Sequence, residues 1–129
     1  MDMFIDIETF SATDLVSCGV FKYSEDPEFE VLLFGYAFND EPVEVIDLTG
    51  AELPPRLADA LTDPGITKHA WNAAFERTCL AAWMKEPMLP EQWNDTMILA
   101  ANCGLPLGLD ACCKALNLDA SAAKVSWTS

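Results

Sequence analysis

Polar and apolar residues alternate over residues 3–10, and this period of two predicts a β-strand. Residues 31–38 form an almost continuous apolar run, and residues 43–48 form a second β-rich run after a short polar turn. Two such runs joined by a turn are typical of an antiparallel hairpin. Residues 66–70 predict one further short strand. The pattern therefore predicts three strands close together in the chain and a fourth one later.

Two helices are predicted in the middle of the chain. A proline pair begins the first, over residues 55–61, and Asn72 is placed to cap the second, over residues 73–84. The second helix carries an apolar stripe at helical spacing, and Glu76 lies one position off this stripe. The stripe consists of Phe75, Cys79, Ala82 and Trp83.

Two more helices are predicted further on. Asn94 is placed to cap a helix over residues 95–102, and residues 109–116 predict a last short helix. Residues 11–26 mix small, polar and scattered apolar residues, so they predict a long loop with a short extended piece at residues 20–23.

The length and composition fit a single folded domain spanning residues 1–129. The order of three strands, helix, strand and helices predicts an α/β layer fold with a mixed sheet. A hydrophobic fraction of 51% excludes wholesale disorder, and no apolar run reaches the ~18 residues of a membrane-spanning helix. The first residues include acids where a signal peptide would be basic and apolar, so a cytoplasmic location is expected, in a bacterium or a phage-infected host cell.

The charge is strongly acidic and uneven. The formal net charge is −14, with 15 acidic and 2 basic residues in residues 1–64 against 6 and 5 in residues 65–129. Such a surface repels phosphate at long range, which argues against a protein that coats nucleic acid. It is compatible with an enzyme that holds cations between its own carboxylates and a phosphate, because metal ions reverse the local electrostatics.

Other reactive side chains have simpler explanations. The five cysteines lack the spacing of a zinc site and are expected to be reduced, buried thiols. The single histidine, His69, has no convincing Ser or Cys partner for nucleophilic catalysis, so a structural role is expected. Asp95 lies at the start of a predicted helix, where the helix dipole explains an acid.

Two acids on one face of the first strand give the sharpest chemical signal. Asp6 and Glu8 are two positions apart, so their side chains lie on the same side of the strand, roughly 6–7 Å apart. Mg²⁺ and Mn²⁺ prefer carboxylate oxygens and would relieve the repulsion between them. The alternative is the solvated face of an edge strand. Glu76, in the first turn of its helix, is also explained by the dipole alone.

In combination, three segments resemble a known family. Residues 4–9, Phe-Ile-Asp-Ile-Glu-Thr, resemble the first exonuclease motif of the 3′→5′ proofreading domains of family-A DNA polymerases, especially phage-borne versions. Residues 72–76, Asn-Ala-Ala-Phe-Glu, resemble the second motif, and residues 93–97 resemble the helix start that follows it. The family uses four catalytic Asp or Glu residues on a ribonuclease-H-like fold. The likeness spans nearly the whole chain in the right order.

The resemblance implies a ribonuclease-H-like mixed sheet, three antiparallel strands first and then a parallel one, with flanking helices. It also implies a two-metal exonuclease that hydrolyses phosphodiester bonds at single-stranded DNA 3′ ends. Asp6 would bridge two Mg²⁺ or Mn²⁺ ions, Glu8 would hold the ion that activates water, and Glu76 would serve the second ion. Thr9 and Asn72 would lie near the 3′-terminal nucleotide. A polymerase module, in cis or in trans, would be the partner.

Two features depart from the family pattern. Glu76 stands where the second motif commonly ends in Asp, and the extra methylene changes the reach of the carboxylate by about one bond, to which catalysis is sensitive. The third motif, a Tyr or His followed by the fourth carboxylate, is not found, since only Asp119 follows Asn117 as an acid. We therefore expect the C-terminal part of the domain to be incomplete and the chain alone to have weak or no activity.

Three alternatives remain open at this point. A catalytically incomplete module of the same fold could bind a 3′ end or a partner protein without cleaving. An acidic phage protein could mimic DNA and occupy a DNA-binding partner, although a mimic needs exposed rows of acids. A second copy or a separate chain could supply the missing carboxylate. Metal titration and size measurements would separate these alternatives.

Overall fold

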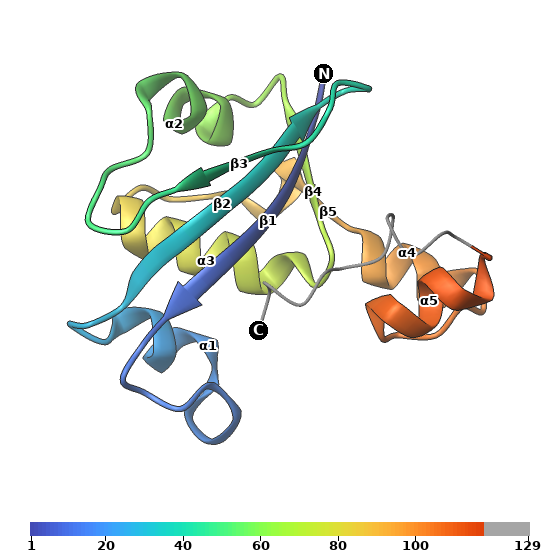
Figure 1. The fold of residues 1–129 in the computed structure, drawn as a ribbon, viewed down its shortest axis with the longest axis horizontal. Helices are drawn as coiled ribbons and strands as arrows, with labels where there is room; N and C mark the ends of the chain where they lie inside the picture. The colour runs from blue at the N-terminus through green and yellow to red at the C-terminus, as the bar shows by residue number, and fades with distance from the viewer. Residues whose placement is uncertain (118–129) are drawn as a thin grey trace.

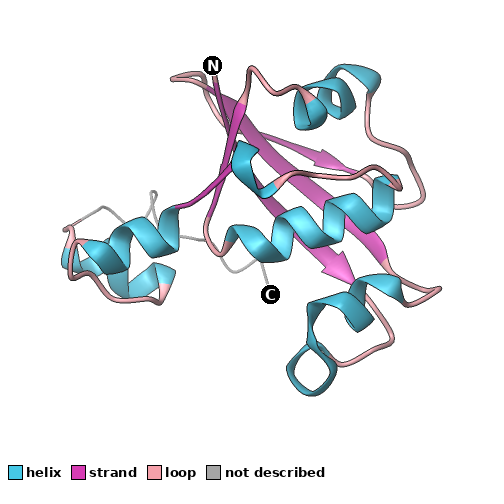
Figure 2. Cartoon of the chain, turned by 180° about the vertical axis from the view of Figure 1, so that it is seen from behind, coloured by secondary structure: helices cyan, strands magenta, loops and turns pink. Residues whose placement is uncertain are grey.

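The computed structural model describes residues 1–117. Its centre is a five-stranded mixed sheet with the strand order β3-β2-β1-β4-β5. Figure 1 views the sheet with helix α3 behind it, and Figure 2 shows the same helix in front of the sheet from the other side. The predicted α/β class and mixed sheet are confirmed.

The antiparallel half of the sheet contains β1 (Asp2–Phe10), β2 (Glu30–Phe38) and β3 (Glu44–Asp47). β2 pairs antiparallel with both of its neighbours, as the predicted hairpin requires. The register between β1 and β2 shifts between Glu8 and Thr9. A bulge of this kind locally changes the direction of side chains, and here it lies next to Glu8, one of the two candidate acids of β1.

The parallel half was only partly predicted. β4 (Thr67–Ala70) pairs parallel with the start of β1, as the implied fold requires. β5 (Trp93–Asp95) pairs parallel with β4 and follows the 3₁₀ turn η1 (Pro90–Gln92). A strand of three residues is too short to show a period of two, so the sequence pattern did not reveal it.

The start of the fourth helix corrects the predicted cap. Asn94 lies within β5, and α4 (Thr96–Asn102) begins after Asp95, which is its N-cap. The Asp95 carboxylate accepts a hydrogen bond from the backbone N–H of Met97, the standard N-cap contact. α5 (Leu109–Ala115) follows and confirms the last predicted helix.

Residues 11–26 are not the predicted loop. They contain α1 (Leu15–Glu25), which is bent at Gly19, where φ is 81° and ψ is 166°. This left-handed backbone suits glycine, because other residues would strain there. The glycine separates two short helical pieces whose small and polar residues give no clear helical period. α1 contacts α3, so the segment is part of the folded domain.

The core lies between the inner face of the sheet and the helices α2 (Pro55–Thr62) and α3 (Ala73–Met84). Both helices match their predicted ranges to within one residue. Leu57 of α2 and Leu80 of α3 are fully buried, and burying such a side chain contributes about 1.5–3 kcal/mol. Core residues of the sheet come from alternate positions of β1 and their partners on β2: Met3, Ile5, Ile7, Phe34 and Tyr36.

The buried stripe of α3 differs from the predicted one. Of the predicted set only Cys79 is fully buried, and Phe75 and Trp83 pack partly against the core. Glu76 lies on the buried side rather than one position off it. The buried residues of α3 are Ala73, Glu76, Cys79 and Leu80. An acid in this stripe breaks the apolar pattern, which is why the sequence placed the stripe elsewhere.

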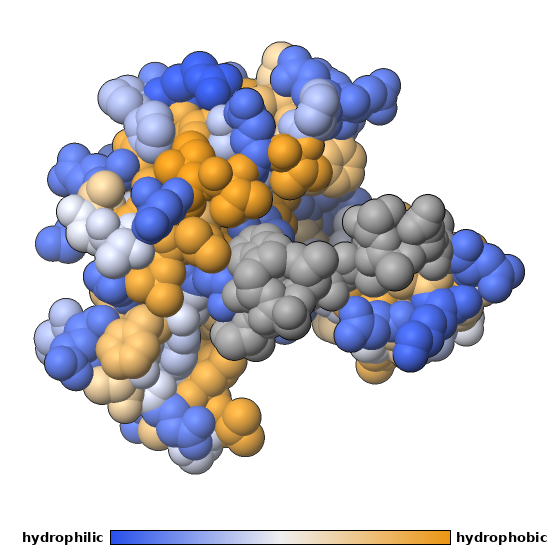
Figure 3. All heavy atoms as spheres, viewed as in Figure 1, coloured by the Kyte–Doolittle hydropathy of each residue, from blue (hydrophilic) through white to orange (hydrophobic). Residues whose placement is uncertain are grey.

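Within residues 1–117, α3 packs against β5, β2, β1 and β4. On the outer face Phe4 and Val45 are 43% and 51% exposed. Figure 3 shows apolar side chains gathered over the strands on this side, with hydrophilic residues around them.

All five cysteines are free, but Cys18 and Cys103 are exposed, so the prediction of buried thiols is wrong for these two. Among the described residues, no helix has the length and apolar character needed to span a membrane.

Candidate active site

Two of the predicted acids meet in one pocket. Glu8 lies near the end of β1 and Glu76 lies in the first turn of α3, and both line a cavity of about 290 Å³. Their exposed fractions are only 9% and 4%. Thr9 and Asn72, the predicted nucleotide contacts, line the same cavity. The chain reversal between β4 and α3 therefore brings the two resembling motifs together.

Asp6 is placed differently. It is half-buried, two positions before Glu8 on β1, and it does not belong to the lining of this cavity. Within residues 1–117, no three His, Cys, Asp or Glu side chains are grouped as a metal site. Asp119, the only acid after Asn117, lies outside the described residues. The structure thus brings two of the three predicted acids into one cavity and leaves Asp6 outside its lining.

Helix α1 supplies a wall of the cavity that the sequence did not predict. Tyr23 and Leu15 of α1 line it together with Trp71 and Phe75. The Tyr23 hydroxyl and the Thr9 Oγ1 are 2.8 Å apart and share a hydrogen bond. The Tyr23 ring also contacts the Phe75 ring, with centroids 6.0 Å apart. The sequence analysis did not place Tyr23 in the site, because it missed the helix that carries this residue.

Asn72 precedes α3, but it does not cap the helix with its side chain. Its backbone is left-handed, with φ 63° and ψ 57°, a conformation that asparagine tolerates better than most residues. Its backbone N–H donates to the Asp95 Oδ1 at 3.0 Å, and the same oxygen accepts from Met97 N at 2.9 Å. Asp95 therefore fixes both the turn before α3 and the start of α4.

The position of Glu76 has two electrostatic consequences. In the first turn of α3 it lies near the positive end of the helix dipole, which stabilises a carboxylate. One turn later, burial together with the negative charge of Glu76 raises the pKa of Cys79 to about 12. Cys79 is therefore a neutral thiol at ordinary pH, and it serves packing rather than chemistry.

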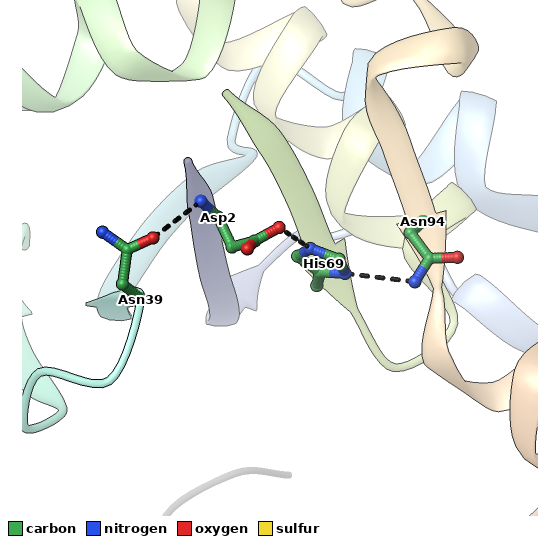
Figure 4. Close-up of polar contacts among 4 residues, drawn as sticks. All are labelled: Asp2, Asn39, His69 and Asn94. Atoms are coloured by element: carbon green, nitrogen blue, oxygen red, sulfur yellow. Dashed lines mark hydrogen bonds and ion pairs between the residues drawn. The ribbon is translucent and has the colours of Figure 1, made fainter. Parts of the chain in front are cut away.

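His69 has the expected structural role. Figure 4 shows its ring between Asp2 and Asn94, with Nε2 2.8 Å from Asp2 Oδ1 and Nδ1 3.1 Å from the Asn94 amide. The Asp2 backbone N–H in turn donates to the Asn39 Oδ1. The ring also stacks on Phe4 at 4.8 Å. With both ring nitrogens engaged, His69 links neighbouring strands and has no nitrogen left for catalysis.

Comparison with known proteins places these features in context. No family model matches the chain. The chain is 51% identical over 117 residues to a DNA polymerase of Bacillus phage SP02. The matched region covers 90% of this chain and 18% of the polymerase. It therefore corresponds to less than a fifth of that relative.

Solved structures share the fold. NrnC of Brucella melitensis bound to pGG matches 99% of this chain and 58% of its own, with a TM-score of 0.68 and 20% identity. The same protein with bound Mg²⁺ gives a TM-score of 0.66. Escherichia coli RNase D, an exoribonuclease, matches 99% of this chain and 32% of its own, with a TM-score of 0.64 and 23% identity. The chain thus has the ribonuclease-H-like fold of these exonucleases and is related in sequence to part of a phage DNA polymerase.

Proposed function

We propose that the chain is the 3′→5′ exonuclease domain, or the larger part of one, of a phage-type DNA polymerase. In this role it would remove nucleotides from single-stranded DNA 3′ ends during proofreading. The observation that carries the proposal is the meeting of Glu8 and Glu76, from distant segments, as buried acids in one cavity. A divalent cation between two neighbouring carboxylates relieves their mutual repulsion, which supports a metal site at this cavity.

The acids fit a divalent metal. Hard cations such as Mg²⁺ and Mn²⁺ choose carboxylate oxygens, and the described cavity offers Glu8 and Glu76, with Asp6 next to them on β1. The Mg²⁺ in a structure of similar fold agrees with this choice. Bound metal would supply a nucleophilic water and charge neutralisation at the scissile phosphate. We propose two ions, which Glu8 and Glu76 of the cavity, together with Asp6 of β1, would hold.

The other residues of the cavity would position the substrate. Thr9 presents a hydroxyl whose orientation is fixed by Tyr23. Asn72 is held at the rim through the hydrogen bond of its backbone to Asp95. The aromatic rings of Trp71 and Phe75 offer surfaces for a nucleobase, since bases stack on aromatic side chains. A cavity of about 290 Å³ is at the small end of ligand sites and suits a single terminal nucleotide better than a duplex end.

The fourth carboxylate of the family pattern would come from outside residues 1–117. Residues beyond 117, the polymerase module, a second copy or a separate chain could supply it. Buried acids argue against the DNA-mimic alternative, because a mimic presents its charges to the partner.

Metal binding tests the proposal directly. Mn²⁺ at ten times its Kd should stabilise the chain by about 1.4 kcal/mol. Glu76→Gln or Glu8→Gln should abolish this shift in the melting temperature. Glu91→Gln, which removes an exposed acid of η1, is the matched control and should leave the shift unchanged.

An activity assay complements the metal test. A 5′-labelled single strand should shorten stepwise in Mn²⁺. Asp6→Ala should stop the shortening. Unchanged melting curves with and without Mn²⁺, together with an intact oligonucleotide, would instead favour a non-catalytic binding module.

A further inference from the structure

A pair of hydroxyl groups lies in the wall of the active-site cavity, next to the buried acids. Tyr23 of α1 and Thr9 of β1 both line the cavity, and their hydroxyl oxygens are 2.8 Å apart. Thr9 follows Glu8 directly in the chain, at the register shift between β1 and β2. A residue of the unpredicted helix is therefore bonded to the neighbour of a proposed metal ligand.

Several contacts hold Tyr23 in this position. Its ring meets the Phe29 ring edge-on, with centroids 5.7 Å apart, and the Phe75 ring at 6.0 Å. The Ser11 hydroxyl donates to the backbone carbonyl oxygen of Tyr23 at 2.7 Å, which ties α1 to the segment after β1. Both ribbon views show α1 beside the end of β1 (Figures 1 and 2). Because ring and backbone are both held, the Tyr23 hydroxyl is a fixed partner for Thr9.

The chemistry of the pair suits one kind of ligand group. A hydroxyl has one proton to donate and two lone pairs that accept, and a threonine hydroxyl on its own rotates to suit its surroundings. The bond to Tyr23 removes this rotation and leaves Thr9 with either its proton or its lone pairs for a ligand. A ligand hydroxyl can answer both cases, because it donates and accepts, whereas phosphate oxygens only accept.

The place of the pair indicates which part of a nucleotide it meets. The acids of the cavity would hold metal ions at the scissile phosphate, and the Thr9 Cα is ~3.8 Å from that of Glu8. The sugar is the part of the nucleotide bonded directly to this phosphate. Sugars inside a DNA strand are esterified at both of their oxygens, so the free hydroxyl of a 3′-terminal nucleotide is the 3′-hydroxyl.

We propose that Tyr23 is a positioning residue of this site, which holds the Thr9 hydroxyl so that it bonds the free 3′-hydroxyl of the terminal sugar. The inference rests on the proposed exonuclease function, which places the terminal nucleotide in the cavity. Tyr23 acts through Thr9 and does not itself need to touch the nucleotide. The end of α1 thus takes part in distinguishing the end of a strand from its interior.

The test uses two mononucleotides that need no cleavage: thymidine 5′-monophosphate and its 3′-deoxy analogue, each titrated calorimetrically into the chain in Mn²⁺. The ratio of their Kd values measures the contribution of the 3′-hydroxyl. For the unmodified chain this ratio should be about ten, which corresponds to one good hydrogen bond. Tyr23→Phe keeps the ring and should lower the ratio to about three or less, because it weakens the binding of thymidine 5′-monophosphate alone.

Variants of Thr9 separate positioning from packing. Thr9→Val removes the hydroxyl at nearly the same shape and should bring the ratio to about one, whereas Thr9→Ser keeps the hydroxyl and should retain most of the ratio. Adding Tyr23→Phe to Thr9→Val should change the ratio no further, since Tyr23 acts through Thr9. A merely structural role of Tyr23 would weaken both nucleotides equally and leave the ratio of the unmodified chain intact, which would overturn the inference.

Tyr36→Phe is the matched control. Tyr36 is the other of the two tyrosines in the chain, its hydroxyl donates to Glu44, and it does not line the cavity. The control removes the same atom and should leave the ratio unchanged.

The outcomes separate this inference from the proposed function. Equal Kd values for the two nucleotides in the unmodified chain, or equal effects of Tyr23→Phe and Tyr36→Phe, would overturn the inference alone, since the cavity would still bind a nucleotide. Tighter binding of ribothymidine 5′-monophosphate, lost in Tyr23→Phe, would assign the pair to a 2′-hydroxyl and also overturn it. Failure of every nucleotide to bind in Mn²⁺ would overturn the inference and the proposed function together.

Discussion

Asp95 connects the active-site turn to the rest of the fold, and its removal gives a quantitative test. One carboxylate oxygen accepts from Asn72 N at 3.0 Å and from Met97 N at 2.9 Å. Loss of an N-cap costs about 1 kcal/mol. Loss of the second hydrogen bond, from Asn72 N to the charged carboxylate, costs about 1.5 kcal/mol. This value is the low end of the range for hydrogen bonds to charged groups, because Asp95 is only half-buried. Asp95→Ala should therefore destabilise the chain by about 2–3 kcal/mol.

The assay is thermal and chemical unfolding of Asp95→Ala, Asp95→Asn and the unmodified chain. For a domain of 129 residues the expected loss lowers the melting temperature by about 10 °C. Asp95→Asn keeps an acceptor oxygen and should lose less than half as much. Asp110→Ala removes an acid that lies in the first turn of α5 but is not its N-cap, and it should lose only a few tenths of a kcal/mol. Equal stability of all four proteins would refute the argument that Asp95 holds the turn.

Three further predictions concern other contacts. A double-mutant cycle of Thr9→Val and Tyr23→Phe should give a coupling of about 1 kcal/mol for their hydrogen bond, and a coupling near zero would contradict the 2.8 Å contact. Cys79 should resist a disulfide reagent in the folded chain, since its pKa is raised to about 12 by burial and a nearby acid, and should react after denaturation; fast reaction in the native state would be inconsistent with this. The hydrogen bond to Glu44, then burial, raises the pKa of Tyr36 in the folded state. The contribution of Tyr36 to folding stability is therefore complete below pH 10 and is lost as the pH rises through the higher pKa of the folded state. The difference in unfolding free energy between the unmodified chain and Tyr36→Phe, measured in urea, should shrink above pH 10.

The strands and helices that sequence predicted well are those with a long, consistent period. β1 alternates over most of its length, and α3 is twelve residues with clear end signals. The pattern failed where elements are short or interrupted: β5 has three residues, and α1 is broken by a left-handed Gly19. In both cases tertiary contacts decide the structure, β5 through pairing with β4 and α1 through packing on α3.

Of the predicted residues, Glu8, Glu76, Thr9 and Asn72 line the candidate cavity, whereas Asp6 does not, and the part of the wall that α1 supplies was not predicted. Glu8 and Glu76 were singled out because of their order and spacing in a resembling pattern, and the fold brings them to one cavity. Tyr23 was missed together with α1. The role of Asp95 was underestimated, because a helix-dipole explanation uses its charge and overlooks the second hydrogen bond, to Asn72. Contacts between residues distant in sequence are invisible to local patterns.

The charge distribution can now be reconciled with a nucleic-acid substrate. Most of this surface would repel phosphate, so the approach of a nucleic acid must depend on metal ions held at the buried acids. Chelation removes that attraction, whereas monovalent salt screens the surrounding repulsion. Binding of a single-stranded oligonucleotide should therefore require Mg²⁺, and Glu76→Gln should weaken it severalfold in Mg²⁺ and have little effect after chelation. Equal binding with and without Mg²⁺, or an equal effect of Glu76→Gln and Glu91→Gln, would contradict this account.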